Sequence, residues 1–405
     1  SDGITTVIGA LKDFALEGED ALDKFQASTG TSTQAMGQFR KEILDLYKGN
    51  YGDSIADVAD AMAEVKQQTN ETDPSKIKDL TQNAIALRDT FGFDIQESMR
   101  AVNMLTQQFG ITGEQAFNLI AQGAQKGLNK NGDLLDSINE YGVHYKQMGV
   151  SAEGFFNSLE NGTKAGTFSV DKLGDAYKEF GIRVKDTANT TTEAYQLLGL
   201  DADQMRKKFA KGGKSAADAT KQVLKKLMSM DDKVKQNQAG VNLFGTMWED
   251  LGIKGVKALT NVNGTANKSA TTLKDLDKVR YDNAKSQLAM IGRSLKVDVL
   301  EPIVSAVIPA LMKFGQWFTS NIPTILGYLT AIGTALAIIY RGAIIAKITE
   351  QFGALTKAVK GLWELIMFNP FIALGAVLAG IVVGLTTYAI ANRKAEQAQD
   401  KNYVA

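Results

Sequence analysis

Hydrophobic positions recur every three or four residues along most of the chain, a spacing that places them on one face of an α-helix. The first three such stretches have apolar positions at Met36, Phe39, Ile43 and Leu46, at Ile55, Val58, Met62 and Val65, and at Ile77, Leu80, Leu87 and Phe91. No stretch alternates convincingly with the period of two that a half-buried strand requires. The pattern predicts an all-α protein.

Four short phrases share one formula that is typical of the junction between two helices. They read FGFDIQESM (91–99), FGITGEQAF (109–117), MGVSAEGFF (148–156) and LGLDADQMR (198–206). In each, the glycine suits the left-handed position that ends a helix. The N-caps of the following helices would be Asp94, Thr112, Ser151 and Asp201, with Glu97, Gln115 and Gln204 placed to complete three capping boxes. The uneven spacing predicts an irregular array of short helices and helical hairpins.

Two polar segments, QQTNETDPS (67–75) and VNGTANKSATT (262–272), interrupt the helical pattern and indicate loops. The second loop is expected to separate a globular helical region from a longer helix. The predicted division comprises N-terminal amphipathic helices at 1–75, a helical core module at 76–262, a long helix at 273–318, a hydrophobic helical hairpin with an amphipathic connector at 319–394, and a polar tail at 395–405.

Two blocks without a charged residue, 314–340 and 365–392, are long enough to cross a hydrocarbon core. Small residues four positions apart in the second block would let helices approach closely in lipid. The candidate membrane or helix-packing residues are Trp363, Pro370, Ala376, Gly380 and Gly384. A second interpretation stays open, in which the blocks form a buried helical hairpin of a soluble oligomer and other copies cover their apolar faces.

The net charge is zero, with 45 basic and 45 acidic residues, so it does not indicate a nucleic-acid partner. Residues 1–100 nevertheless carry 10 Lys and Arg against 18 Asp and Glu, whereas residues 201–300 carry 19 against 11. Such a separation favours head-to-tail association or a charged lining, although it also arises by chance. There is no cysteine, which excludes disulfides and thiolate chemistry. The opening SDGITT lacks an initiator Met, so we expect a fragment or a processed chain.

Patterns that carry catalysis are missing from the sequence. In KFAKGGKSA, Lys208 stands where a phosphate-binding loop needs a glycine, so a helix end followed by a new cap is the simpler interpretation. The one histidine, His144, cannot form a zinc site alone. A Ser-His-Asp triad is not indicated either, because no Gly-x-Ser-x-Gly nucleophile motif accompanies it. We expect His144 to be a surface or packing residue. The sequence predicts no enzyme, no catalytic residue, no metal site and no cofactor.

Several phrases resemble the tail tape-measure proteins of tailed phages, most closely over residues 90–260. They are GLDADQMRKKFAKGGKSAADAT (199–220), SMDDKVKQNQAGVNLFGTMWEDLG (229–252) and the stretch 149–186 that begins GVSAEGFF. The most specific phrase is FGTMWEDLG, whose motif residues are Phe244, Gly245, Trp248, Glu249 and Asp250. The resemblance identifies residues 76–262 as the core module of such a protein.

This resemblance implies a structural virion protein that lies in the lumen of the tail tube in a few copies. It would set tail length during assembly and leave ahead of the DNA, with apolar helices that could insert in the host cell membrane. The implied partners are the tail tube protein, baseplate or tail-tip proteins, tail assembly chaperones, further copies of the chain and the host membrane, but no specific nucleic-acid sequence.

The glycine junctions between residues 91 and 206 would interrupt a single ruler helix. We therefore expect residues 90–260 to be a compact module, or else helices that are stretched inside the tube and refold after release. An alternative function from another class is a helical pore-forming or membrane-translocated effector, which would use the same hydrophobic hairpin.

Overall fold

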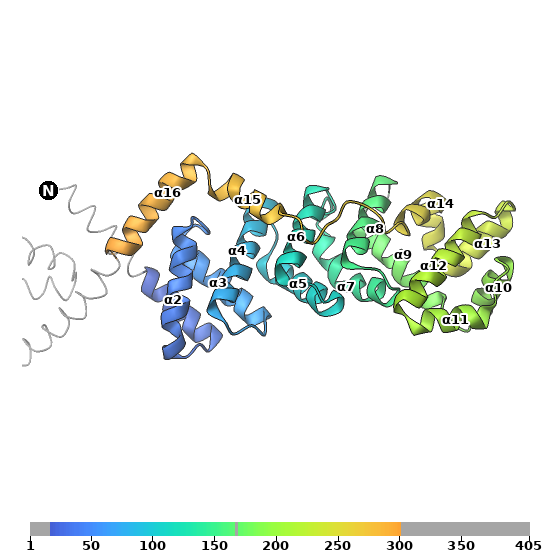
Figure 1. Ribbon diagram of the computed structural model, residues 1–405, viewed down its shortest axis with the longest axis horizontal. Helices are drawn as coiled ribbons and strands as arrows, with labels where there is room; N and C mark the ends of the chain where they lie inside the picture. Colours follow the sequence, from blue (N-terminus) through green and yellow to red (C-terminus); the bar gives the residue numbers. More distant parts are fainter. Residues whose placement is uncertain (1–16, 167–168, 301–405) are drawn as a thin grey trace, which may run out of the picture. The chain divides into compact units, whose positions relative to one another are not determined.

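The computed structural model describes residues 17–166 and 169–300, and these residues form helices joined by turns, with no strand among them (Figure 1). Residues 17–29 are helical. The following helices are α2 (Thr33–Lys48), α3 (Ile55–Gln68), α4 (Pro74–Phe91), α5 (Ile95–Phe109), α6 (Gly113–Gln125), α7 (Leu134–Gln147), α8 (Ala152–Lys164), α9 (Val170–Arg183), α10 (Asn189–Leu197), α11 (Ala202–Lys211), α12 (Gly213–Met228), α13 (Lys233–Phe244), α14 (Met247–Leu259), α15 (Thr272–Tyr281) and α16 (Ala284–Leu295), with a π-helix at Lys296–Leu300. The all-α prediction is confirmed.

Residues Ala21–Ile291 form one compact unit, in which the helices pack in two rows. Helices α3, α5, α7 and α9 contact one another in succession, and so do α4, α6 and α8. Helix α14 extends the second row by packing on α8 and α9, while α10 to α13 form a group that joins the first row through α9 and α13. The expected boundary between residues 75 and 76 does not separate compact units, because α4 packs against α2 and α3.

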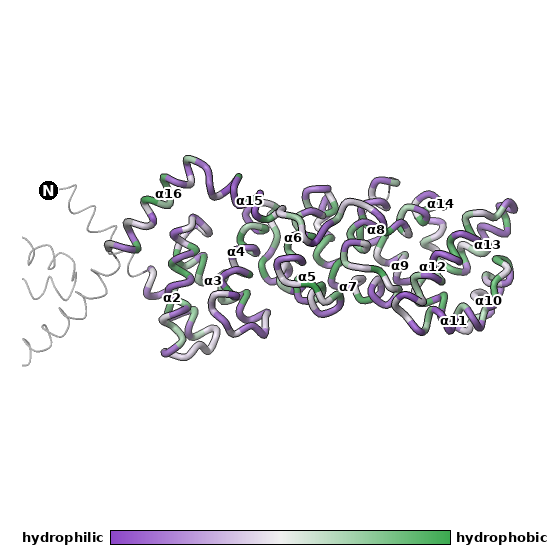
Figure 2. The backbone as a smooth tube through the Cα atoms, in the orientation of Figure 1, coloured by the Kyte–Doolittle hydropathy of each residue, from purple (hydrophilic) through white to green (hydrophobic). Residues whose placement is uncertain are grey.

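The core is made of the apolar positions that the helical spacing singles out. Phe39 and Ile43 of α2, and Val58 and Met62 of α3, are at most 2% exposed. Figure 2 shows hydrophobic and hydrophilic stretches alternating along these helices. Burial of each such side chain contributes about 1.5–3 kcal/mol, so the matched apolar faces supply the main force that holds the rows together.

All four glycine junctions have the predicted geometry. The left-handed φ angles are 73° at Gly92, 69° at Gly110, 78° at Gly149 and 66° at Gly199. Each expected N-cap side chain accepts a hydrogen bond from the backbone N–H three residues on; these caps are Asp94, Thr112, Ser151 and Asp201. Of these four junctions, the one at α6 has the complete capping box, because the Thr112 N–H also donates to Oε1 of Gln115.

Residues 260–271, here called the strap, are the non-helical segment between α14 and α15. The strap runs back over α8 and α6 and brings α15 against α6 and α4 (Figure 1). The predicted loop is confirmed, but the single helix expected over 273–318 is wrong in its described part. Helix α15 ends at Tyr281 and α16 begins at Ala284, because the Asn283 side chain accepts the Ser286 N–H and caps a new helix.

Across the described residues, helices fall short of the combination of length and apolar composition that a membrane span needs. The two uncharged blocks, 314–340 and 365–392, lie outside the described residues. The same holds for the candidate membrane or helix-packing residues Trp363, Pro370, Ala376, Gly380 and Gly384. Their proposed roles therefore stay predictions.

Candidate functional site

The FGTMWEDLG motif lies where α13 ends and α14 begins, against α9. Phe244 is fully buried and stacks on Phe180 of α9, with ring centroids 4.6 Å apart. The Phe180 ring also meets Phe209 of α11 edge-on at 6.0 Å. Phe244 therefore joins three helices that are distant in sequence, and aromatic contacts of this kind add about 0.5–1.5 kcal/mol beyond simple burial.

Gly245 makes the turn that lets α14 follow α13. Its φ of 62° is left-handed, and its N–H donates to the Val241 carbonyl. A Cβ at this position would lie 2.9 Å from Nη2 of Arg183 on α9. The backbone conformation thus favours glycine here, and a larger residue would also require the Arg183 side chain to shift.

Trp248 closes the turn by lying back on α13. Its indole N–H donates to Asn237 Oδ1 at 2.8 Å, and the residue is only 5% exposed. A Cβ on Gly240 would come within 2.2 Å of the indole ring, so the ring rests directly on the backbone of α13. Gly245 and Trp248 therefore hold the start of α14 against α13.

The two acidic motif residues sit at the exposed start of α14. Glu249 and Asp250 occupy its first turn, where a negative charge interacts favourably with the helix dipole. Asp250 also faces Lys172 of α9 at 3.5 Å. All five motif residues consequently have structural roles, and none is arranged with a nucleophile or a base.

A ladder of amide side chains on α6 and α8 holds the strap. Asn157 donates to the Val262 carbonyl and accepts the Ala266 N–H, and Gln122 forms both bonds with the backbone of Asn267 itself, at 2.8 and 3.1 Å. The remaining bonds join Asn161 to the carbonyls of Asn261 and Asn263, and Asn118 to the Leu273 N–H. The ladder satisfies backbone groups that have no helical partner.

Beside this ladder, the buried carboxylate of Glu160 pairs with two lysines that reach solvent. Lys126 donates to Glu160 at 2.6 Å and to the Thr265 hydroxyl of the strap, and Lys164 donates to the other Glu160 oxygen. Burial raises the pKa of Glu160, but the hydrogen bonds from both lysines outweigh it, so the pKa lies below its ordinary value. The ionised carboxylate thus fixes Lys126 for its contact with the strap.

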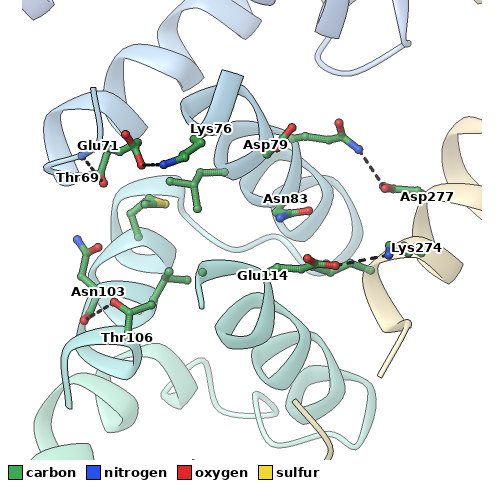
Figure 3. Close-up of a pocket in the computed structure, with 16 residues that line it drawn as sticks. Thr69, Glu71, Lys76, Asp79, Asn83, Asn103, Thr106, Glu114, Lys274 and Asp277 are labelled. Carbon is green, nitrogen blue, oxygen red and sulfur yellow. Dashed lines mark hydrogen bonds and ion pairs between the residues drawn. The ribbon is translucent and has the colours of Figure 1, made fainter. Parts of the chain in front are cut away.

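A polar cleft of about 550 Å³ lies between α4, α5, α6 and α15 (Figure 3). Gln82 donates to Asp277 and to the Tyr51 hydroxyl, while Lys274 of α15 faces Glu114 of α6 at 3.7 Å. One Asp277 oxygen is buried without a hydrogen-bond partner, and burial raises the pKa of this carboxyl despite its bonds to Gln82 and Tyr51. These contacts attach α15 to the helical rows.

Comparison with known proteins identifies the family. The family model of the phage-related minor tail protein matches residues 34–245, which is more than half of the chain. The chain belongs to this family.

The chain is also similar to a relative named as a probable tape measure protein from Streptomyces phage phiC31. The two sequences are 34% identical over 270 residues, which cover 64% of this chain and 36% of the phage phiC31 protein. The match thus spans about a third of that relative's length. No solved structure matches the chain. The resemblance to tape-measure proteins in the sequence is confirmed.

The family match includes Phe244 and Gly245 but ends before Trp248, Glu249 and Asp250. The strap also follows the matched residues, and its ladder escaped the sequence reasoning. A signal was present, since Asn118 and Gln122 of α6 are four residues apart on one helix face, as are Asn157 and Asn161 of α8; of these four, all but Asn161 are buried. Amides in such positions need partners when buried.

Other sequence candidates in this minor tail protein have ordinary packing roles. His144 is half-buried on α7, and burial, followed by the charges of Lys178 and Lys185, lowers its pKa. The expected helix junction is present, since α11 ends at Lys211 and α12 begins at Gly213, but no side chain caps α12; Lys214 pairs with Asp218 at 2.8 Å. No cluster of His, Asp and Glu that could hold a metal occurs within 17–166 and 169–300.

Proposed function

We propose that this chain is part of a phage tail tape-measure protein and acts as a structural component inside the tail tube. The observation that carries the proposal is the 34% identity over 270 residues shared with the phage phiC31 protein. The packing roles of the FGTMWEDLG residues support a structural rather than a catalytic function. The proposed partners are the tail tube protein, baseplate or tail-tip proteins, assembly chaperones and a few further copies.

The first test is the composition of purified particles. Peptides from residues 149–252 should be found by mass spectrometry in intact tails and should be lost from particles that have ejected their DNA. A tail without these peptides would contradict the virion location. Secretion of the chain without particles would instead favour the pore-forming or translocated effector.

Length setting is tested by deleting residues 273–299 in frame. If these 27 residues are extended as helix inside the tube, tails should shorten by about 40 Å, at about 1.5 Å per residue. A matched control, Leu273→Ala with Tyr281→Ala, removes the contacts of α15 but keeps the number of residues. Tails of normal length in electron micrographs of the deletion mutant would place the ruler in another part of the protein.

We also propose that the chain leaves the tail ahead of the DNA and that its two uncharged blocks, 314–340 and 365–392, then insert in the host membrane. A chain with Gly380→Leu and Gly384→Leu should assemble normal tails yet deliver less DNA, because the larger side chains would prevent close helix packing. Liposome leakage caused by the chain should fall in parallel. Normal delivery and leakage by this variant would contradict the role of these glycines.

A further inference from the structure

Helices α11 and α12 pack against each other and carry six exposed lysines on their outer sides (Figure 1). Four of the six stand two residues from a buried apolar residue, a spacing that turns a side chain to the opposite side of a helix at about 100° per residue. The bond from Lys208 to Oε1 of Gln222, at 3.2 Å, shows that the outer sides of the two helices adjoin. This surface is called the lysine face; its members are Lys207, Lys208 and Lys211 of α11, and Lys221, Lys225 and Lys226 of α12.

The positive charge of the lysine face is not neutralised within the described residues. None of its members forms an ion pair there. The acidic residue of α11, Asp203, pairs instead with Arg206 at 3.3 Å. The acidic residue of α12, Asp218, pairs with Lys214 at 2.8 Å. The lysine face therefore keeps all of its charge, which the zero net charge of the whole chain conceals.

The arrangement of these lysines opposes the stability of the free chain. Lys207 and Lys211 are four residues apart on α11, where like charges repel along a helix. Lys221 and Lys225 have the same spacing on α12. The helix dipole favours the lysines of the last turns, but Lys207 and Lys221 stand before those turns. A polyanion that spans both helices would remove this repulsion.

The chemistry of the lysine face suits phosphates better than a protein or a lipid bilayer. Among the described residues, the large hydrophobic side chains that are exposed all lie outside α11 and α12. The face thus lacks the apolar centre of a protein interface, where lysine is depleted, and the apolar side that a membrane-surface helix buries. Contacts with phosphates need positive charge alone. The aromatic residue of α11, Phe209, is buried, so nucleic-acid bases have no ring to stack on.

We propose that the lysine face binds the sugar-phosphate backbone of nucleic acid without reading its sequence. Each lysine places its ammonium group near a phosphate and displaces a counterion that had condensed there. Because lysine charges supply the contacts, the identity of the bases has little effect. Such binding is a property of the chain in solution, so its absence would leave the proposed place of the chain in the tail unaffected.

Fluorescence anisotropy of a labelled duplex DNA, titrated with the full chain, tests this proposal. With six phosphate contacts, the affinity should fall about 1,000-fold between about 50 and 200 mM salt, and two unrelated sequences should bind alike. The variant Lys207→Gln/Lys221→Gln/Lys225→Gln should bind at least about tenfold more weakly at the lower salt concentration. The slope of log affinity against log salt should become shallower by about 2.7, at about 0.9 for each lost contact. Arginine at the same three positions should preserve binding, because it preserves the charge.

The matched control removes three exposed lysines from other parts of the chain, in the variant Lys130→Gln/Lys278→Gln/Lys285→Gln. Its affinity should be almost that of the wild type. Equal losses in the two triple variants, or a wild-type chain that binds neither DNA, would overturn the proposal. Binding of polyglutamate or anionic vesicles, but not DNA, through the lysine face would also overturn it, since the partner would then be an acidic protein or a lipid surface.

Lysine acetylation of the unmodified chain is the second measurement, in case circular dichroism shows that a variant is not folded. A lysine-reactive ester followed by peptide mass spectrometry should label the lysine face several times less when duplex DNA is present. Lys130, Lys278 and Lys285 should react as before. If DNA leaves the labelling of the lysine face unchanged, it does not occupy this surface and the proposal is wrong.

Discussion

Replacing Gly240 with alanine tests the packing of Trp248 on α13. The new methyl group would overlap the indole ring, whose nearest atoms lie 2.2 Å from the Cβ position. Overpacking of this kind costs about 1–3 kcal/mol, and a displaced indole would lose its bond to Asn237, worth about 1 kcal/mol. Alanine in a helix returns roughly 1 kcal/mol relative to glycine. The net expectation is a loss of about 1–3 kcal/mol in the free energy of unfolding.

The assay is thermal unfolding of the full chain followed by circular dichroism, in which Tm should fall by roughly 2–10 °C. Gly37→Ala is the matched control, because Gly37 lies in α2 with no atom within 4 Å of its Cβ position. This control should raise Tm by up to about 4 °C through helix propensity alone. Asn237→Ala should cost stability in the wild type but little in Gly240→Ala, since its partner has already moved. If both glycine variants gain equal stability, the described contact between Trp248 and α13 is incorrect.

Three further variants test individual interactions by the same unfolding assay. Thr112→Ala should cost about 1 kcal/mol because it removes the capping box of α6, whereas Thr246→Ala at α14, whose side chain makes no cap bond, should cost less. Asp277→Asn should raise Tm at neutral pH, since it removes the charge of a half-buried carboxyl whose pKa is raised in the folded state; an unchanged or lower Tm would count against this burial. For Glu160 the folded pKa is lowered, so its stabilising effect is complete above its ordinary pKa of 4.5 and is lost as the pH falls through the folded value. Glu160→Gln should therefore flatten the loss of stability in acid, and parallel pH curves for the two proteins would contradict the pairing with Lys126.

Local structure was predictable because its causes lie within a few residues. A left-handed glycine and a cap side chain act on the backbone next to them, so Gly110 and Thr112 specify the junction of α5 and α6 whatever surrounds it. The apolar spacing likewise identified Phe39 and Val58 as core residues. The same reasoning failed at Asn283, whose capping of α16 breaks the expected long helix, because an Asn among helical residues does not show whether it caps or simply faces water.

The candidate site was only partly visible in the sequence. FGTMWEDLG stood out as a phrase, but its physical meaning depends on Phe180 and Arg183, about sixty residues earlier, and on the tight approach of Trp248 to Gly240. Contacts between such distant positions arise only when the helices have docked. The motif could therefore be recognised in the sequence, but its role in packing α9, α13 and α14 against one another could not.

The sequence by itself determined that the chain is helical, where four of the helix junctions lie, and which faces of the first helices are apolar, because these properties follow from local propensity and spacing. Only the tertiary structure decided the path of the strap and the return of α15 to α4 and α6. A polar segment without periodicity has no preferred direction of its own. Its course is fixed by Asn157 and Gln122, more than one hundred residues away, which supply the hydrogen bonds that its backbone would otherwise make with water.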